Sequence, residues 1–159
     1  MRYDQVEAAI RRLVDTAGED ELRVFGIETV ARLVCDERLV DIAADGELDE
    51  DAVAAFTLAR ETVGTADAAA SRALMTRIDE GVLTDGDMDP ELLIVLAALE
   101  HWTTYLETGQ RGELYELALR SVEQVDYQVS ADLDDFLATP EMAAEYARIA
   151  RLSQGRPPA

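Results

Sequence analysis

Apolar residues recur at intervals of three and four positions along nearly the whole chain, and no segment alternates between apolar and polar residues as a half-buried strand does. Glycine, proline and cap-forming residues fall mainly between these periodic segments. The pattern predicts helices after Asp4, over 20–44, after Asp49, after Thr65, over 89–107, after Gly112 and after Thr139. We therefore expect an all-α fold: a single domain over residues 1–153, built as a largely antiparallel bundle of about seven helices, with a disordered tail over 154–159.

Two of the predicted helices are apolar on most sides, which is typical of helices surrounded by others. The segment near 20–44 is one. The segment near 89–107 is the other, and it has the clearest start signal in the chain, an N-cap aspartate (Asp89) followed by proline. Its first turns would also fit a buried strand, but helical spacing continues through Trp102 and Tyr105. Both segments are expected to be central and buried.

The charge balance is strongly negative. There are 34 acidic residues against 14 basic residues, which gives a net charge of −20 at pH 7. A surface this negative repels nucleic acid and anionic membranes and attracts basic partners. Two similar Asp-Gly segments lie in runs that lack any basic residue, and each precedes a predicted helix. If both lie at one end of the bundle, they form an acidic patch of Asp45, Glu47, Asp49, Asp85, Asp87 and Asp89. An ordinary solvated end of a bundle explains the same charges equally well.

Cysteine usage and hydropathy bear on the compartment. The single cysteine, Cys35, cannot form a disulfide within the chain, which favours a reducing environment. The first residues lack the apolar core of a signal peptide, and the longest apolar run is too short to span a bilayer. We expect a cytoplasmic protein that does not associate with membranes.

No pattern in the chain predicts catalysis, a cofactor or a metal site. His101 is the single histidine, and nothing pairs it with a nucleophile and an orienting acid. The residue three positions before it is Ala98, so the Glu-x-x-His motif of di-iron bundles is missing. A calcium loop beginning at Asp41 would place Ala52 where a bidentate glutamate is needed. A glycine-rich phosphate loop is also lacking.

The C-terminal part carries a resemblance to known proteins. The segments DPELLIVLAALEHWTTYLETG, ELYELALRSVEQVDYQV and LATPEMAAEYARIARL form a long apolar helix, an acidic amphipathic helix and a final helix begun by Thr-Pro. Over residues 85–152 this layout resembles a family of small all-helical bacterial proteins of unknown function, including the pair Glu145 and Tyr146. In size, helicity and acidity the chain is also similar to immunity proteins that neutralise secreted bacterial toxins. These resemblances imply no catalytic residue.

Three functions remain open from the sequence. The leading hypothesis is a non-catalytic protein-interaction module, an immunity- or antitoxin-like inhibitor whose acidic patch binds a basic partner protein. The first alternative is a sensor or enzyme that binds a small ligand in an interior pocket lined by Cys35, His101, Trp102 and Tyr105. The second alternative is a structural homodimer. Nucleic acid is not expected as a partner.

Overall fold

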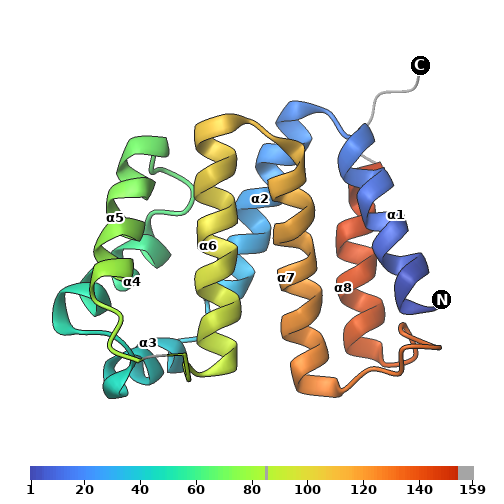
Figure 1. Ribbon diagram of the computed structural model, residues 1–159. Helices are drawn as coiled ribbons and strands as arrows, with labels where there is room; N and C mark the ends of the chain where they lie inside the picture. The colour runs from blue at the N-terminus through green and yellow to red at the C-terminus, as the bar shows by residue number, and fades with distance from the viewer. Residues whose placement is uncertain (85, 154–159) are drawn as a thin grey trace.

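Helices make up most of the computed structural model, which describes residues 1–84 and 86–153 (Figure 1). The helices are α1 (Tyr3–Thr16), α2 (Glu19–Val34), α3 (Arg38–Ile42), α4 (Glu50–Glu61), α5 (Ala68–Glu80), α6 (Pro90–Thr108), α7 (Arg111–Val129) and α8 (Pro140–Ala150). A short π-helical turn, η1 (Ala43–Glu47), follows α3, and a 3₁₀ turn, η2 (Arg151–Ser153), follows α8. The predicted all-α bundle of about seven helices is confirmed. The predicted disordered tail, 154–159, lies outside the described residues.

Helices α6 and α7 form the centre of the bundle. α6 packs against α2, α3, α5 and α7, while α7 also packs against α1, α2 and α8. Figure 1 shows α6, α7 and α8 alternating in direction, with α2 crossing behind α6 and α7. The apolar turns of α6 are largely buried, and its fully or nearly fully buried side chains are Leu92, Ile94, Val95, Leu96, Ala98, Leu99, Trp102 and Thr103. The central position predicted for 89–107 is therefore confirmed.

The contact between α2 and α6 depends on one glycine. Trp102 is 2 % exposed and stacks on Tyr105, with ring centroids 5.6 Å apart. The six-membered ring of Trp102 lies so close to Gly26 of α2 that a Cβ on this glycine would collide with it. Glycine costs helix stability relative to alanine, so its place inside α2 is explained by this close approach.

Between 20 and 44 the sequence predicts one continuous helix, and the structure contains two helices and a turn instead. α2 ends at Val34, where the guanidinium of Arg60 on α4 donates a hydrogen bond from Nε to the Val34 carbonyl (2.6 Å). Asp36 then accepts hydrogen bonds from the backbone N–H of Arg38 (3.0 Å) and from its guanidinium (2.7 Å). Such local side-chain bonds compete with the regular helical pattern and start a new helix.

Three predicted helix starts are confirmed by their cap hydrogen bonds. Asp49 accepts from the N–H of Ala52 (2.8 Å), Asp89 accepts from the N–H groups of residues 91 and 92, and Thr139 accepts from the N–H of residue 142. The start after Asp4 is wrong, because α1 begins at Tyr3. The capping box is closed by Gln5, whose Oε1 accepts from the N–H of Arg2 (2.8 Å).

Helix α8 is held to α2 by a cluster of charges that is mostly buried. Glu145 is 6 % exposed and accepts hydrogen bonds from Nε and Nη2 of Arg148, the shortest at 2.6 Å. The Nε of Arg32 on α2 lies 3.1 Å from the other carboxylate oxygen of Glu145. Burial lowers the pKa of the Arg32 guanidinium. Arg148 also donates to the hydroxyl of Thr29 (3.0 Å). One carboxylate thus balances two guanidinium groups.

Across the described residues, no helix combines the length and the apolar character needed to cross a membrane.

Candidate docking surface

The segments that precede α4 and follow α5 lie side by side. The N–H of Asp49 donates to the carbonyl of Gly81 (2.8 Å), and the N–H of Leu83 donates to the carbonyl of Glu47 (2.9 Å). Leu48 and Val82 face each other as an isolated antiparallel bridge. Gly81 is required here, because a Cβ would collide with the side chains of residues 49 and 52. The first Asp-Gly segment is therefore fixed against the chain that leads into the second.

The residues of the predicted acidic patch do not have equal roles. Asp49 and Asp89 cap helices α4 and α6, so both carboxylates are engaged with backbone N–H groups. Glu47 is half-buried, and its Oε2 accepts a hydrogen bond from the hydroxyl of Thr84 (3.3 Å). Asp45 and Asp87 are exposed. The remaining member, Asp85, lies outside the described residues.

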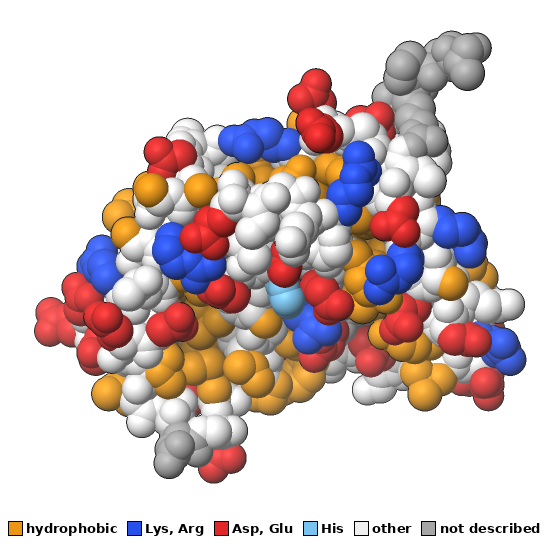
Figure 2. All heavy atoms as spheres, turned by 45° about the horizontal axis from the view of Figure 1, so that its top comes forward, with side chains coloured by type: hydrophobic (Ala, Val, Ile, Leu, Met, Phe, Trp, Pro, Cys, Tyr) orange, Lys and Arg blue, Asp and Glu red, His pale blue; other side chains and the backbone are white. Residues whose placement is uncertain are grey.

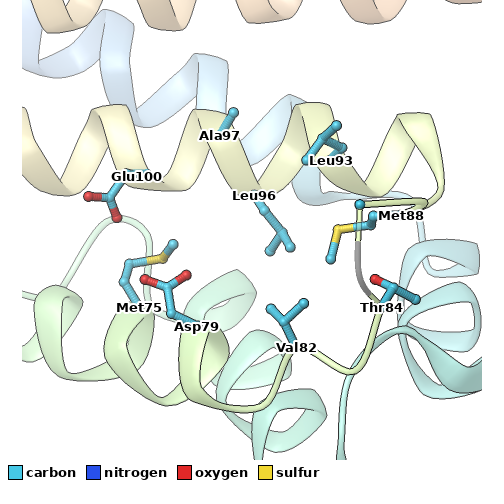
Figure 3. A pocket seen from close by; sticks show the side chains of 10 residues that line it. Met75, Asp79, Val82, Thr84, Met88, Leu93, Leu96, Ala97 and Glu100 are labelled. Carbon is cyan, nitrogen blue, oxygen red and sulfur yellow. The ribbon is translucent and has the colours of Figure 1, made fainter.

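A groove lies between α5, α6 and the segment that connects them (Figure 3). Its volume is about 400 Å³, within the range of ~300–1,000 Å³ that is usual for ligand sites. Figure 3 shows Leu96 of α6 pointing into the space toward α5 and Val82, with Met75 and Met88 on either side. The lining residues are Met75, Asp79, Val82, Thr84, Gly86, Met88, Leu93, Leu96, Ala97 and Glu100. We call this space the α5–α6 groove.

The two carboxylates that line the α5–α6 groove lie at one end of it (Figure 3). Asp79 and Glu100 lie there, and Thr84 lies at the opposite end (Figure 3). Glu100 is paired with Arg72, whose Nη1 lies 2.9 Å from both carboxylate oxygens, and Arg72 also pairs with Glu107 (2.7 Å). Within the described residues no cation lies at ion-pair distance from Asp79. Partial burial and the charge of Glu100 raise the pKa of Asp79, against the opposing charge of Arg72.

A second hollow of about 260 Å³ lies on the other side of α6, toward α7. Leu93 and Ala97 line both hollows, so they form the ridge between them. Of the eight large apolar side chains that are exposed in the described residues, three line one or both of these hollows: Val82 (38 %), Leu93 (55 %) and Tyr127 (52 %). We call these three residues, with Ala97, the apolar face.

Figure 2 shows an extended orange area bordered by red carboxylates in the lower part of the view. Isolated apolar residues are normal on protein surfaces, whereas larger patches with polar rims mark interaction sites. The apolar face and the groove beside it therefore form a candidate functional site.

The residues of the predicted interior pocket are only partly brought together. Trp102 and Tyr105 stack, but they line different hollows: Trp102 an internal one of about 10 Å³, and Tyr105 a polar one of about 280 Å³. Neither hollow is lined by Cys35 or His101. Cys35 is exposed, and its thiol donates to the carbonyl of Arg32 (3.0 Å). The imidazole of His101 lies 2.8 Å from a carboxylate oxygen of Glu113, which joins α6 to α7.

The α5–α6 groove was not predicted from the sequence. The feature of the sequence that could have indicated it is the run of apolar residues over 92–99, which covers every side of α6. A helix apolar all round must either be enclosed completely or leave an apolar side exposed. Leu93 is the residue at which enclosure fails.

The described residues contain no group of three or more His, Cys, Asp or Glu side chains arranged to hold a metal ion. In comparisons with protein-family models, with curated proteins and with solved structures, nothing matches this chain.

Proposed function

We propose that this chain is a non-catalytic protein-binding module, an inhibitor of the immunity or antitoxin type, whose acidic surface binds a basic partner protein. The proposal is supported by the arrangement of apolar and acidic residues at the candidate site. The apolar face around Leu93 adjoins a groove with an acidic end, in a chain whose net charge is −20. Such a surface supplies both components of a tight interface, an apolar centre and a charged surround.

The two components act differently on binding. Burial of the apolar face, including Leu93 and Tyr127, contributes affinity, because clustered side chains in a desolvated centre dominate binding energies. The surrounding carboxylates raise the association rate for a basic partner and disfavour acidic ones. The same charge opposes association of two copies of the chain, which makes a homodimer the weaker alternative.

The small-ligand alternative is supported by the volume of the α5–α6 groove, about 400 Å³, rather than by the residues predicted to line an interior pocket. A thermal-shift screen of metals, nucleotides and lipids tests it. A ligand at 100 times its dissociation constant adds ~2.7 kcal/mol to the free energy of unfolding, which is readily detected.

The acidic surface is tested with immobilised protein in an extract of the native host, at low and then moderate salt. We expect a basic protein to be retained stoichiometrically at low salt and to be lost as the salt concentration rises, because exposed charge interactions are screened. The patch variant carries Asp45→Asn, Glu47→Gln and Asp87→Asn and should retain much less. The cap residues Asp49 and Asp89 stay unchanged, since loss of a cap costs about 1 kcal/mol by itself.

A matched control neutralises three exposed acids elsewhere on the molecule: Asp15→Asn on α1, Glu61→Gln at the end of α4 and Asp134→Asn between α7 and α8. It has the same net charge as the patch variant, so a general effect of charge affects both equally. Full retention by the control with loss by the patch variant supports a localised acidic site. Retention that is insensitive to salt and equal for both variants contradicts the proposal.

A further inference from the structure

The helical walls of the α5–α6 groove, which supply six of its ten lining residues, offer side chains to an occupant. Its two long walls are helices, whose backbone N–H and C=O groups are already hydrogen-bonded within α5 and α6. An occupant must therefore satisfy its own backbone polar groups while it presents apolar side chains to Met75, Val82 and Leu96. An α-helix meets both conditions, because its hydrogen bonds are internal and its apolar residues form one stripe.

We propose that the α5–α6 groove binds one amphipathic α-helix of the partner, with a short apolar stripe flanked at one end by lysine or arginine. This inference rests on the proposed function and names the element of the basic partner that enters the site. The apolar stripe lies along Leu96, Val82 and Met88, and the basic end lies at Asp79 and Glu100.

Charge complementarity favours a cationic helix over other occupants of the groove. Asp79 faces the groove with no cation at ion-pair distance among the described residues, since Arg72 is engaged by Glu100 and Glu107. Burial and the charge of Glu100 raise the pKa of Asp79, and the charge of Arg72 opposes them without cancelling them. A second copy of the chain or an anionic membrane would bring more negative charge to this end. A cationic helix supplies the missing charge.

The two methionines of the groove can adapt to apolar side chains of different shapes on the helix that binds there. Thioether side chains are flexible and polarisable, and they adapt to different apolar partners. Met88 is half-buried in the segment after α5, and Met75 lies at the other side of Leu96 (Figure 3). The chain has four methionines in all, and the others, Met1 and Met142, lie outside the groove. Methionine methyl groups therefore report on groove occupancy with two internal controls.

The test uses full-length protein with carbon-13-labelled methionine methyl groups, observed by NMR during titration with synthetic peptides. The cationic probe is a helix of about 18 residues, ~27 Å long, with leucine at every third or fourth position and lysines at one end. One control replaces the lysines with glutamine. A second control keeps the composition and scatters the leucines around the helix. We expect the cationic probe to shift the Met75 and Met88 methyl signals and to leave Met1 and Met142 unchanged, and both controls to bind more weakly.

Paired variants separate the groove from general charge and general exposure. Asp79→Asn should weaken the cationic probe about two- to fivefold, the effect of one exposed ion pair, whereas Glu80→Gln on the same helix should have no effect. Leu93→Gln on the ridge should also weaken it, while Leu58→Gln on α4, exposed to 42 % against 55 % for Leu93, should not. These four positions are at the surface, and the thermal unfolding of each variant checks that the fold is kept.

Each contrary result is informative. Equal binding of the lysine and glutamine probes overturns the cationic end of the occupant. The Met75 and Met88 methyl signals could instead shift when the protein is concentrated without any probe, together with a dimer mass in light scattering. That result would show that a second copy fills the groove, and it would overturn the inference. If no probe shifts Met75 or Met88 while the host protein is still retained in a salt-dependent way, the partner docks elsewhere. In that case the inference fails and the proposed function stands. If no probe shifts these signals and the host protein is not retained in a salt-dependent way either, both the inference and the proposed function fail.

Discussion

The buried carboxylate of Glu145 provides the most discriminating test of how the bundle is held together. It lies between Arg148 of α8 and Arg32 of α2, at 2.6 Å and 3.1 Å from their nitrogens. Replacing Glu145 with alanine leaves the guanidinium groups of Arg32 and Arg148 without an anion at ion-pair distance among the described residues. Removing one partner of a buried ion pair costs about 3–5 kcal/mol, because the remaining charge stays desolvated.

The exposure of the two arginines places the expected loss of unfolding free energy within this range of about 3–5 kcal/mol. The side chain of Arg148 is 14 % exposed and keeps its hydrogen bond to Thr29, whereas the side chain of Arg32 is 28 % exposed and can regain water. The expected loss is therefore near the lower limit, about 3 kcal/mol. For a chain of this length each kcal/mol lowers the melting temperature by ~2–4 °C, so a decrease of about 6–12 °C is expected. Glu145→Gln keeps a hydrogen-bond acceptor and should lose less.

The assay is urea unfolding followed by the fluorescence of Trp102, the single tryptophan, and by circular dichroism. The control is Glu123→Ala, which removes an ion pair of the same three-residue spacing, to Arg120 at 2.8 Å. The Glu123 side chain is 47 % exposed, against 5 % for Glu145, so this change should cost at most about 0.5 kcal/mol. If the two variants lose the same stability within ~0.5 kcal/mol, burial of the Glu145 charges does not matter and the reasoning is refuted.

Three further substitutions test other parts of the structure. Gly26→Ala should lower the free energy of unfolding by about 1–3 kcal/mol in urea denaturation, because the added Cβ would collide with Trp102. Burial raises the pKa of Tyr3 to about 12, so its contribution to stability is complete below the unfolded pKa of about 10 and is lost as the pH rises toward 12. Tyr3→Phe should remove this part of the pH dependence in urea unfolding. Glu100→Gln should lower the pKa of Asp79, which burial and the charge of Glu100 raise, in a carbon-13 NMR titration.

Two of these predictions have close controls in the chain. Gly112→Ala lies in the first turn of α7, where a Cβ meets nothing within 4 Å, so it should leave stability unchanged or raise it by up to about 1 kcal/mol. A loss equal to that of Gly26→Ala would contradict the steric argument. Glu107→Gln removes the other carboxylate on Arg72 and should not lower the pKa of Asp79 as Glu100→Gln does. For Tyr3→Phe, an unchanged fall in stability between about pH 10 and 12 would show that other groups cause it.

Local chemistry was sufficient to predict most of the fold. The spacing of apolar residues predicts the helices, and the cap residues Asp49, Asp89 and Thr139 predict three of the starts correctly. These signals are readable because a cap acts within three residues and an apolar stripe repeats at every turn. The break after Val34 was missed, because its cause includes a guanidinium from α4, far away in the sequence.

The candidate site depended on the packing of distant segments. Asp79, Met88 and Leu93 belong to periodic or connecting segments that look ordinary in the sequence, and they line one groove because α5 and α6 pack side by side. Apolar periodicity shows which face of a helix avoids water, but it does not show whether a neighbour covers that face completely. The sequence by itself therefore determined the helices, their caps and the net charge, each of which depends on neighbouring residues or on composition alone. Only the tertiary structure decided which apolar side chains stay exposed and which carboxylate lacks a partner, because both depend on contacts between helices.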